Sequence, residues 1–162
     1  MGRMYVVQFN AIAVSALQDL FEVLAPADSV VIVHGFTLFQ ISDVGDAAEE
    51  ILRLETVRGT GSVTSGSGGT TPTAQPVDDG DPAYGGAVEA NNTTRLAVGT
   101  GTLETLEQFG WNVRIPFTHY WTPETRPVIS PSDYWTLSLP AAPADALTAT
   151  AMLWLEEIGG YT

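Results

Sequence analysis

Apolar and polar residues alternate with a period of two along much of this chain. The alternation is clearest over Trp111–Trp121, where large apolar residues occupy the odd positions from Trp111 to Phe117, and polar residues or proline occupy the even ones. Successive side chains of a β-strand point to opposite faces, so this period predicts a half-buried strand. We interpret Trp111–Trp121 as a wall on which the other strands pack.

The same pattern, together with β-branched and aromatic content, predicts strands elsewhere and gives no long helical period. Short links at Ala13–Gln18 and Asp43–Glu50 leave room for a helical turn. Two Ala-Pro-Ala-Asp turns, beginning at Ala25 and Ala142, each precede a long apolar strand. We therefore expect an all-β fold: an antiparallel, jelly-roll-like sandwich of about eight strands. The other predicted strands are Tyr5–Asn10, Asp19–Leu24, Ser29–Ser42, Ile51–Arg58, Arg95–Phe109, Asp133–Leu139 and Leu147–Ile158.

One segment, Gly59–Thr94, interrupts the alternation. It is rich in Gly, Ser, Thr and Pro and poor in large apolar residues, with at most one short strand near Ala87–Ala90. Loops of this length inside a compact domain are usually functional or disordered. We expect a single domain over residues 1–162 in which Gly59–Thr94 is an extended arm, and we expect removal of Gly61–Gly80 to leave folding intact.

The amino-acid composition excludes or disfavours several classes of protein. The 162 residues include no cysteine, which excludes disulfides and thiolate zinc sites, and no lysine. Six arginines against 19 acids give a formal net charge of −13, which disfavours nucleic acid and anionic membranes as partners. The start of the chain does not resemble a signal peptide, and no apolar run reaches the roughly 20 residues of a membrane span. We expect folding in a cytoplasm.

Candidate catalytic and metal-binding patterns are weak. His34 and His119 are the only histidines and lie in predicted strands, which favours structural roles. The acidic clusters at 43–50 and 78–81 do not fit a calcium loop, although Asp78–Asp81 is the better candidate. The glycine-rich run Thr64–Thr71 lacks the lysine of a phosphate loop, and no Gly-x-Ser-x-Gly elbow joins a strand to a helix. We predict no enzyme and no catalytic, cofactor-binding or metal-ligating residue.

An interface is the better prediction. Leu147–Ile158 is apolar on both faces, so something besides the core covers it, either the long loop or another subunit. Aromatic residues and methionine are enriched at interface cores, and proline confines a strand to an edge or a bulge. The predicted interface residues are Met4, Tyr5, Pro116, Tyr120, Trp121, Trp135, Met152 and Trp154.

Three groups of segments resemble a family of small structural proteins of tailed bacteriophages, the capsid decoration or cement proteins. These groups are Ser42–Glu50 leading into Leu52–Leu54, Gly66–Pro72 with Asn91–Thr94, and Trp121–Pro127 followed by Ala141–Asp145 and Leu155–Glu157. The resemblance implies a β-sandwich that binds the major capsid protein on the outside of the head as a homo-oligomer, with a trimer favoured over a dimer. It implies location on the virion, after synthesis in the host cytoplasm, and no catalytic residues.

Two alternatives remain open from the sequence. The first is a carbohydrate-binding or host-adhesion module of a phage head or tail fibre, in which Trp111, Tyr120, Trp121 and Trp135 stack on sugar rings. The second is a glycan-active enzyme, which needs two carboxylates about 10 Å apart or closer in one pocket. Nothing in the spacing of the acids selects such a pair.

Overall fold

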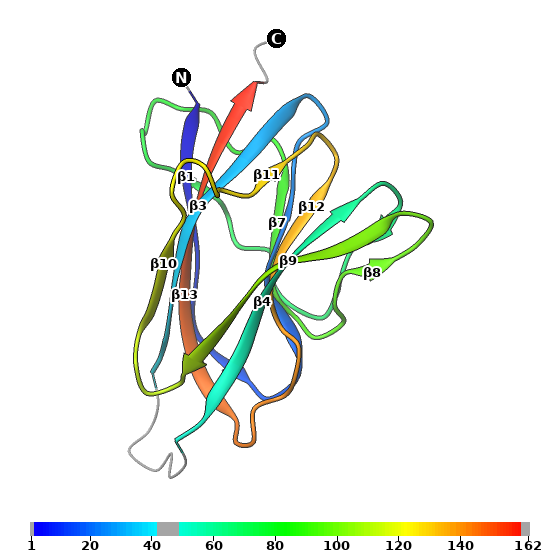
Figure 1. The fold of residues 1–162 in the computed structure, drawn as a ribbon. Helices are drawn as coiled ribbons and strands as arrows, with labels where there is room; N and C mark the ends of the chain where they lie inside the picture. Colours follow the sequence, from blue (N-terminus) through cyan, green and yellow to red (C-terminus); the bar gives the residue numbers. More distant parts are fainter. Residues whose placement is uncertain (1, 42–48, 160–162) are drawn as a thin grey trace.

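The computed structural model describes residues 2–41 and 49–159, and within these ranges the regular structure is entirely β (Figure 1). Sheet A has the strand order β10-β3-β13-β1-β6, with β11 also paired to β3. Sheet B has the order β7-β2-β12-β4-β9, and β5 pairs with β8. The strands are β1 (Arg3–Val14), β2 (Gln18–Leu24), β3 (Ser29–Gln40), β4 (Ile51–Thr60), β5 (Val63–Thr64), β6 (Gln75–Pro76), β7 (Ala87–Asn92), β8 (Ala97–Val98), β9 (Thr102–Asn112), β10 (Phe117–Tyr120), β11 (Val128–Ile129), β12 (Tyr134–Leu139) and β13 (Leu147–Gly159).

The path of the chain confirms the predicted jelly-roll-like sandwich. Strands β1 to β4 alternate between the sheets, β9 stays beside β4 in sheet B, and β10, β12 and β13 alternate again. All the strand pairs are antiparallel. Four strands of each sheet thus form the main sandwich. In it β10-β3-β13-β1 packs against β2-β12-β4-β9, which is the two-sheet arrangement of a jelly roll. The short strands are additions to these eight.

Aromatic side chains fill the space between the two sheets. Phe9 of sheet A meets Phe21 of sheet B with ring centroids 5.1 Å apart, and Phe36 meets Phe109 at 6.0 Å. The inward residues of β13 occupy the odd positions, where Leu147, Ala149, Ala151, Leu153 and Leu155 are all buried, and Thr150 is buried as well. Period-two patterning predicted this face correctly, since burial on one side of a strand is what produces that period.

The expectation of one strand over Trp111–Trp121 is wrong. The strand β9 ends at Asn112 and β10 begins at Phe117, in the other sheet. Asn112 closes the turn between them: its carbonyl accepts the Ile115 N–H at 3.0 Å, and its side-chain oxygen accepts the Arg114 N–H at 3.1 Å. Asn bonding to its own backbone two residues on is a strong turn signal, and Pro116 follows as turn residues do.

The predicted Gly/Ser/Thr/Pro-rich excursion is present, with its short strand at β7, and it is paired with the sandwich. Residues 61–101, the excursion between β4 and β9, form β5 to β8, of which β7 joins β2 and β6 joins β1. The segment therefore borders both sheets, while β8 and the adjoining ends of β4 and β9 extend to the right in Figure 1. It is bonded to the sandwich through buried carboxylates, described below, so deleting part of it removes structural contacts.

Candidate functional site

The outward side of sheet A presents a largely apolar surface. Three rows of side chains cross β1, β13 and β3 in register and end on β10 or β11, and Met4, Val6, Ile32, Met152 and Trp154 are half-buried within them. We call this surface, with Tyr120 and Val128 at its border, the outer apolar face. The rows are Val6–Trp154–Gly35–Tyr120, Met4–Glu156–Ile32–Val128 and Gln8–Met152–Thr37–Thr118.

Gly35 lies at the centre of the first row. A Cβ on this residue would lie 2.3 Å from Tyr120 Cδ1 and 2.6 Å from the His119 carbonyl oxygen. Because Gly35 has no side chain, the Tyr120 ring lies over the strand and approaches Trp154, with ring centroids 5.4 Å apart and planes at 42°. Tyr120 is still 57% exposed, so this aromatic pair is accessible at the surface.

Charge is nearly absent from the outer apolar face. The six strands of sheet A contain only Glu156 and Glu157 of the chain's 19 acids, and Glu157 is buried. Glu156 Oε2 lies 2.8 Å from His34 Nε2, so its charge has a local partner. The acidity of the molecule is therefore concentrated on sheet B, the connections and the excursion.

The predicted interface residues fall into two groups. Met4, Met152 and Trp154 lie on the outer apolar face, Tyr120 lies at its border, and Pro116 is exposed in the β9–β10 turn. Tyr5, Trp121 and Trp135 are core residues with at most 5% exposure, so they have no surface to offer a subunit. The error has one cause. The presence of an aromatic residue in a strand does not show whether its side chain faces the core or the solvent.

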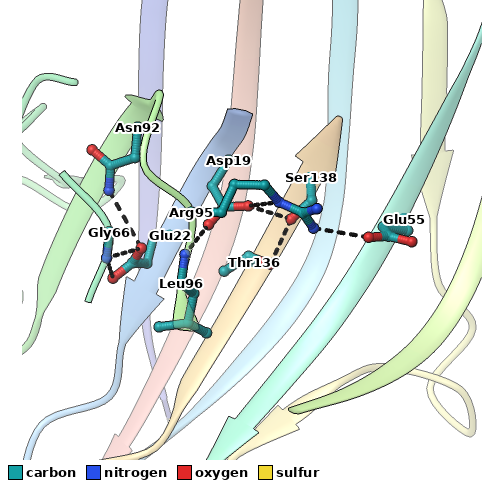
Figure 2. A network of polar contacts seen from close by, with 9 residues as sticks. All are labelled: Asp19, Glu22, Glu55, Gly66, Asn92, Arg95, Leu96, Thr136 and Ser138. Atoms are coloured by element: carbon teal, nitrogen blue, oxygen red, sulfur yellow. Dashed lines mark hydrogen bonds and ion pairs between the residues drawn. The ribbon is translucent and has the colours of Figure 1, made fainter. Parts of the chain in front are cut away.

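On sheet B, buried acids fasten the excursion to the sandwich (Figure 2). Asp19 of β2 is 1% exposed and accepts the Leu96 N–H at 2.7 Å, the Ser138 hydroxyl at 2.5 Å and Arg95 Nε at 3.1 Å. Arg95 also donates to Glu55 at 2.8 Å. Burial acts to lower the pKa of Arg95, but the hydrogen bonds that Arg95 donates to Glu55 and Asp19 outweigh it, and the pKa is raised.

Glu22, also on β2, forms a second attachment. Its carboxylate accepts the Ser65 hydroxyl at 2.5 Å, the Gly66 N–H at 3.0 Å and the Asn92 amide at 3.3 Å. Burial raises the pKa of Glu22, and the bonds from Ser65, Gly66 and Asn92 only partly offset this effect. Asp19 and Glu22 are not among the residues predicted from the sequence; their signal was two acids in a strand whose other residues are mostly apolar.

A third buried acid, Glu157 of β13, is bonded to both β1 and the excursion. It accepts Arg3 Nη2 at 2.6 Å and the Gly85 N–H at 3.1 Å. Nearby, the Tyr84 hydroxyl donates to the Leu24 carbonyl at 2.9 Å and its ring packs edge-on against Tyr5. Burial, reinforced by Glu157, raises the pKa of Tyr84. These groups are structural, because each is occupied by protein partners.

Other candidate residues also have local partners. His119 packs among Phe109 and Trp121, at centroid distances of 4.8 and 4.7 Å. Glu49 accepts the Asn112 amide and Glu50 the Ala144 N–H, while the remainder of the predicted 43–50 cluster falls outside the described residues.

Asp78 closes a turn, accepting the Gly80 N–H at 3.0 Å on its side chain and the Asp81 N–H at 3.0 Å on its carbonyl. The two Asn-x-Thr sequons at Asn91 and Asn92 are buried. In the part of the chain that the structure describes, no three His, Cys, Asp or Glu residues gather as metal ligands would.

Comparison with known proteins identifies no family. No family model and no curated protein matches the chain. A solved structure titled "Structure of infectious bursal disease virus Gx strain" aligns over 99% of this chain and 42% of that chain, at 15% identity and a TM-score of 0.19. Similarity at that level supports no conclusion about fold or function. Among the described residues there is also no helix with the length and apolar character to cross a membrane.

Proposed function

We propose that this protein is a structural, non-enzymatic component of a virion: a decoration protein that binds the outside of a tailed-phage head as a homo-oligomer. The observation that supports the proposal is the outer apolar face. Contiguous exposed apolar surface marks interaction sites, and interface cores are rich in Trp, Tyr and Met and poor in charge. Met4, Tyr120, Met152 and Trp154 supply that composition.

The distribution of charge is consistent with this role. A protein that coats a head is crowded at many equivalent sites, and a net charge of −13 keeps such copies soluble while the nearly neutral face makes contact. Acidic surface also suits the outside of a head rather than packaged DNA. Binding that favours the assembled shell over its free subunits stabilises the shell by mass action.

The test pairs two surface substitutions of similar chemistry. Trp154→Ser on the outer apolar face should lower the mass seen by sedimentation equilibrium from oligomer to monomer, and should weaken co-sedimentation with phage heads assembled without the protein by tenfold or more. Ile51→Ser is the control, because Ile51 is 72% exposed but belongs to β4 of sheet B. Wild-type protein that stays monomeric and does not bind heads at micromolar concentration would contradict the proposal.

A second candidate function is carbohydrate binding, for which the accessible Tyr120–Trp154 pair is the supporting observation. Of the four aromatic residues expected to stack on sugars, Trp111, Trp121 and Trp135 are buried, so only Tyr120 remains available. A glycan array probed with wild type and with Tyr120→Ala separates the two functions. Retained signal in the variant, or no signal from wild type, would rule out this pair as a sugar platform.

A further inference from the structure

The outer apolar face contains a hydrogen-bonded pair of titratable side chains, His34 of β3 and Glu156 of β13. His34 Nε2 lies 2.8 Å from Glu156 Oε2, and the two side chains are only 18% and 20% exposed. Met4 and Ile32 flank Glu156 in its row across the sheet. Gly2 lies so near that a Cβ on it would be 2.2 Å from Glu156 Oε1. The pair is therefore half-enclosed within the surface that the proposed interface would cover.

The charge of the outer apolar face can change near neutral pH only through His34. On the strands packed against the pair and in the β10–β11 connection, the other titratable groups of the described residues are Arg3, Tyr5, Glu157, His119, Tyr120, Glu124 and Arg126. Tyr5 and Glu157 are buried, and His119 packs inside the sandwich. Arginines stay charged and phenols stay neutral near pH 7. The pKa of Glu124 is lowered, mainly by its own backbone N–H, so that group stays ionised. Histidine, in contrast, changes charge between pH 5 and 8.

Protonation of His34 alters the net charge of the pair. An ionised carboxylate only accepts hydrogen bonds, so the neutral imidazole donates its Nε2–H to Glu156, and a further proton binds at Nδ1. The neutral imidazole leaves the pair with one negative charge, whereas the imidazolium makes it an ion pair without net charge. Covering an unpaired charge costs much more free energy than covering a hydrogen-bonded ion pair. Association through this face and protonation of His34 therefore favour one another.

The distribution of charge favours a second copy of this chain as the occupant of the face. Copies with a net charge of −13 repel one another, and the six strands of sheet A contain only two of the 19 acids. Two copies that meet through sheet A keep their acidic sides apart, which lowers the repulsion. A two-fold contact uses the same patch on both copies, so each copy brings its own His34–Glu156 pair.

We propose that two copies pair through the outer apolar face and that acid strengthens this pairing through His34 and Glu156. The proposal rests on the proposed function, which makes this face an interface. At pH 7.5 each copy covers an anionic pair, and at pH 5.5 each covers a neutral one. The association constant therefore rises as the pH falls through the range in which histidines titrate.

The test measures the association constant by sedimentation equilibrium at pH 5.5 and pH 7.5. Wild type should associate about tenfold or more tightly at pH 5.5. His34→Gln is the matched control, because its amide can still donate to Glu156 but cannot gain a proton. Its association should change by less than about threefold between the two pH values, and this residual change reports the titration of the other groups.

Glu156→Gln should reverse the sign of the pH dependence. It removes the anion, so this variant should associate more tightly than wild type at pH 7.5. At pH 5.5 protonation of His34 leaves a cation without its carboxylate on the face, so association should weaken. A role of the pair in folding alone would not produce this reversal. Near-UV circular dichroism of the four tryptophans checks that each variant keeps its packing.

The proposal is overturned if wild type associates equally at both pH values, if His34→Gln keeps the wild-type pH dependence, or if Glu156→Gln also associates more tightly in acid. Each of these results leaves the proposed function in place, because the copies still associate. Wild type that is monomeric at both pH values also overturns the proposal. Co-sedimentation with phage heads then separates two cases. Binding means that the face contacts the head and not a second copy, and no binding means that the proposed function fails as well.

Discussion

Glu22 shows how a single buried acid links the excursion to the pH of the medium. Its carboxylate is 2% exposed and depends on Ser65, Gly66 and Asn92 for hydrogen bonds. Because burial raises the pKa of Glu22 in the folded protein, the folded state holds this proton more firmly than the unfolded state does. Protonated Glu22 therefore stabilises the fold relative to ionised Glu22.

Glu22 therefore stabilises the fold more at low pH than at high pH. The stabilisation from Glu22 is fully present below its unfolded pKa of about 4.5 and is lost as the pH rises through the raised folded pKa. We predict that the unfolding free energy of wild type, minus that of Glu22→Gln, decreases between pH 4 and pH 8 in urea titrations. Asp79→Asn, an exposed acid, is the control and should show no such trend. An increasing difference would contradict the assignment.

Gly35 is the other residue on which local geometry depends. Gly35→Ala places a methyl group against the His119 carbonyl oxygen and the Tyr120 ring, and the backbone oxygen cannot rotate away. We predict a loss of about 1–3 kcal/mol of unfolding free energy, as for other overpacked sites. Gly110→Ala is the matched control in urea titration, because its nearest neighbour would be Ile51 Cγ2 at 3.5 Å, an ordinary contact. Equal losses in both variants would show that the Tyr120 contact is not responsible.

At the scale of elements, alternation predicted strands well and turns poorly. The inward faces of β1 and β13 follow from the sequence, because burial on one side imposes the period directly. The prediction of one strand over Trp111–Trp121 failed because the same period continues through a turn. In that turn Val113 is buried and Ile115 is exposed for reasons unrelated to a strand. Asn112 and Pro116 were the residues that marked the break.

The excursion was the harder case, because its attachment depends on residues far away in the chain. Leu96 donates to Asp19, 77 residues away, and Gly85 to Glu157, 72 residues away. The glycine and serine content predicted an arm. Gly66, however, has no side chain, and this allows its backbone to approach the Glu22 carboxylate closely. A Cβ there would lie 2.4 Å from the Thr94 carbonyl oxygen. Low apolar content argues against a core but not against hydrogen bonding to buried acids.

The contribution of Arg95 to the attachment of the excursion can be measured as a change in the free energy of unfolding. Removing one partner of a buried ion pair costs about 3–5 kcal/mol. Because the Arg95 side chain is 27% exposed, screening should reduce the loss in Arg95→Met to roughly 2 kcal/mol. Arg58→Met is the control, since its pair with Glu104 is largely exposed and should cost about 0–1 kcal/mol in urea unfolding. Similar losses in the two variants would mean that Asp19 does not need Arg95.

For the whole molecule, the surface divides into a nearly neutral side and an acidic remainder. Four members of the nearly neutral side, Met4, Tyr120, Met152 and Trp154, are among the interface residues predicted from the sequence. The sequence could not reveal the pair of His34 and Glu156, because those residues are 122 positions apart and meet only when β3 pairs with β13. Patterns along a strand report its faces, whereas contacts between strands depend on the completed fold.

The position of β13 has a consequence for how the protein is made. In sheet A, β1 and β3 each pair with β13 and not with one another. At the usual rate of synthesis, residues 147–159 follow β1 by roughly 10–30 s, and during that time neither β1 nor β3 has β13 beside it. The outer apolar face is therefore absent from nascent chains. Association through the proposed interface therefore requires that β13 has been translated and has paired with β1 and β3.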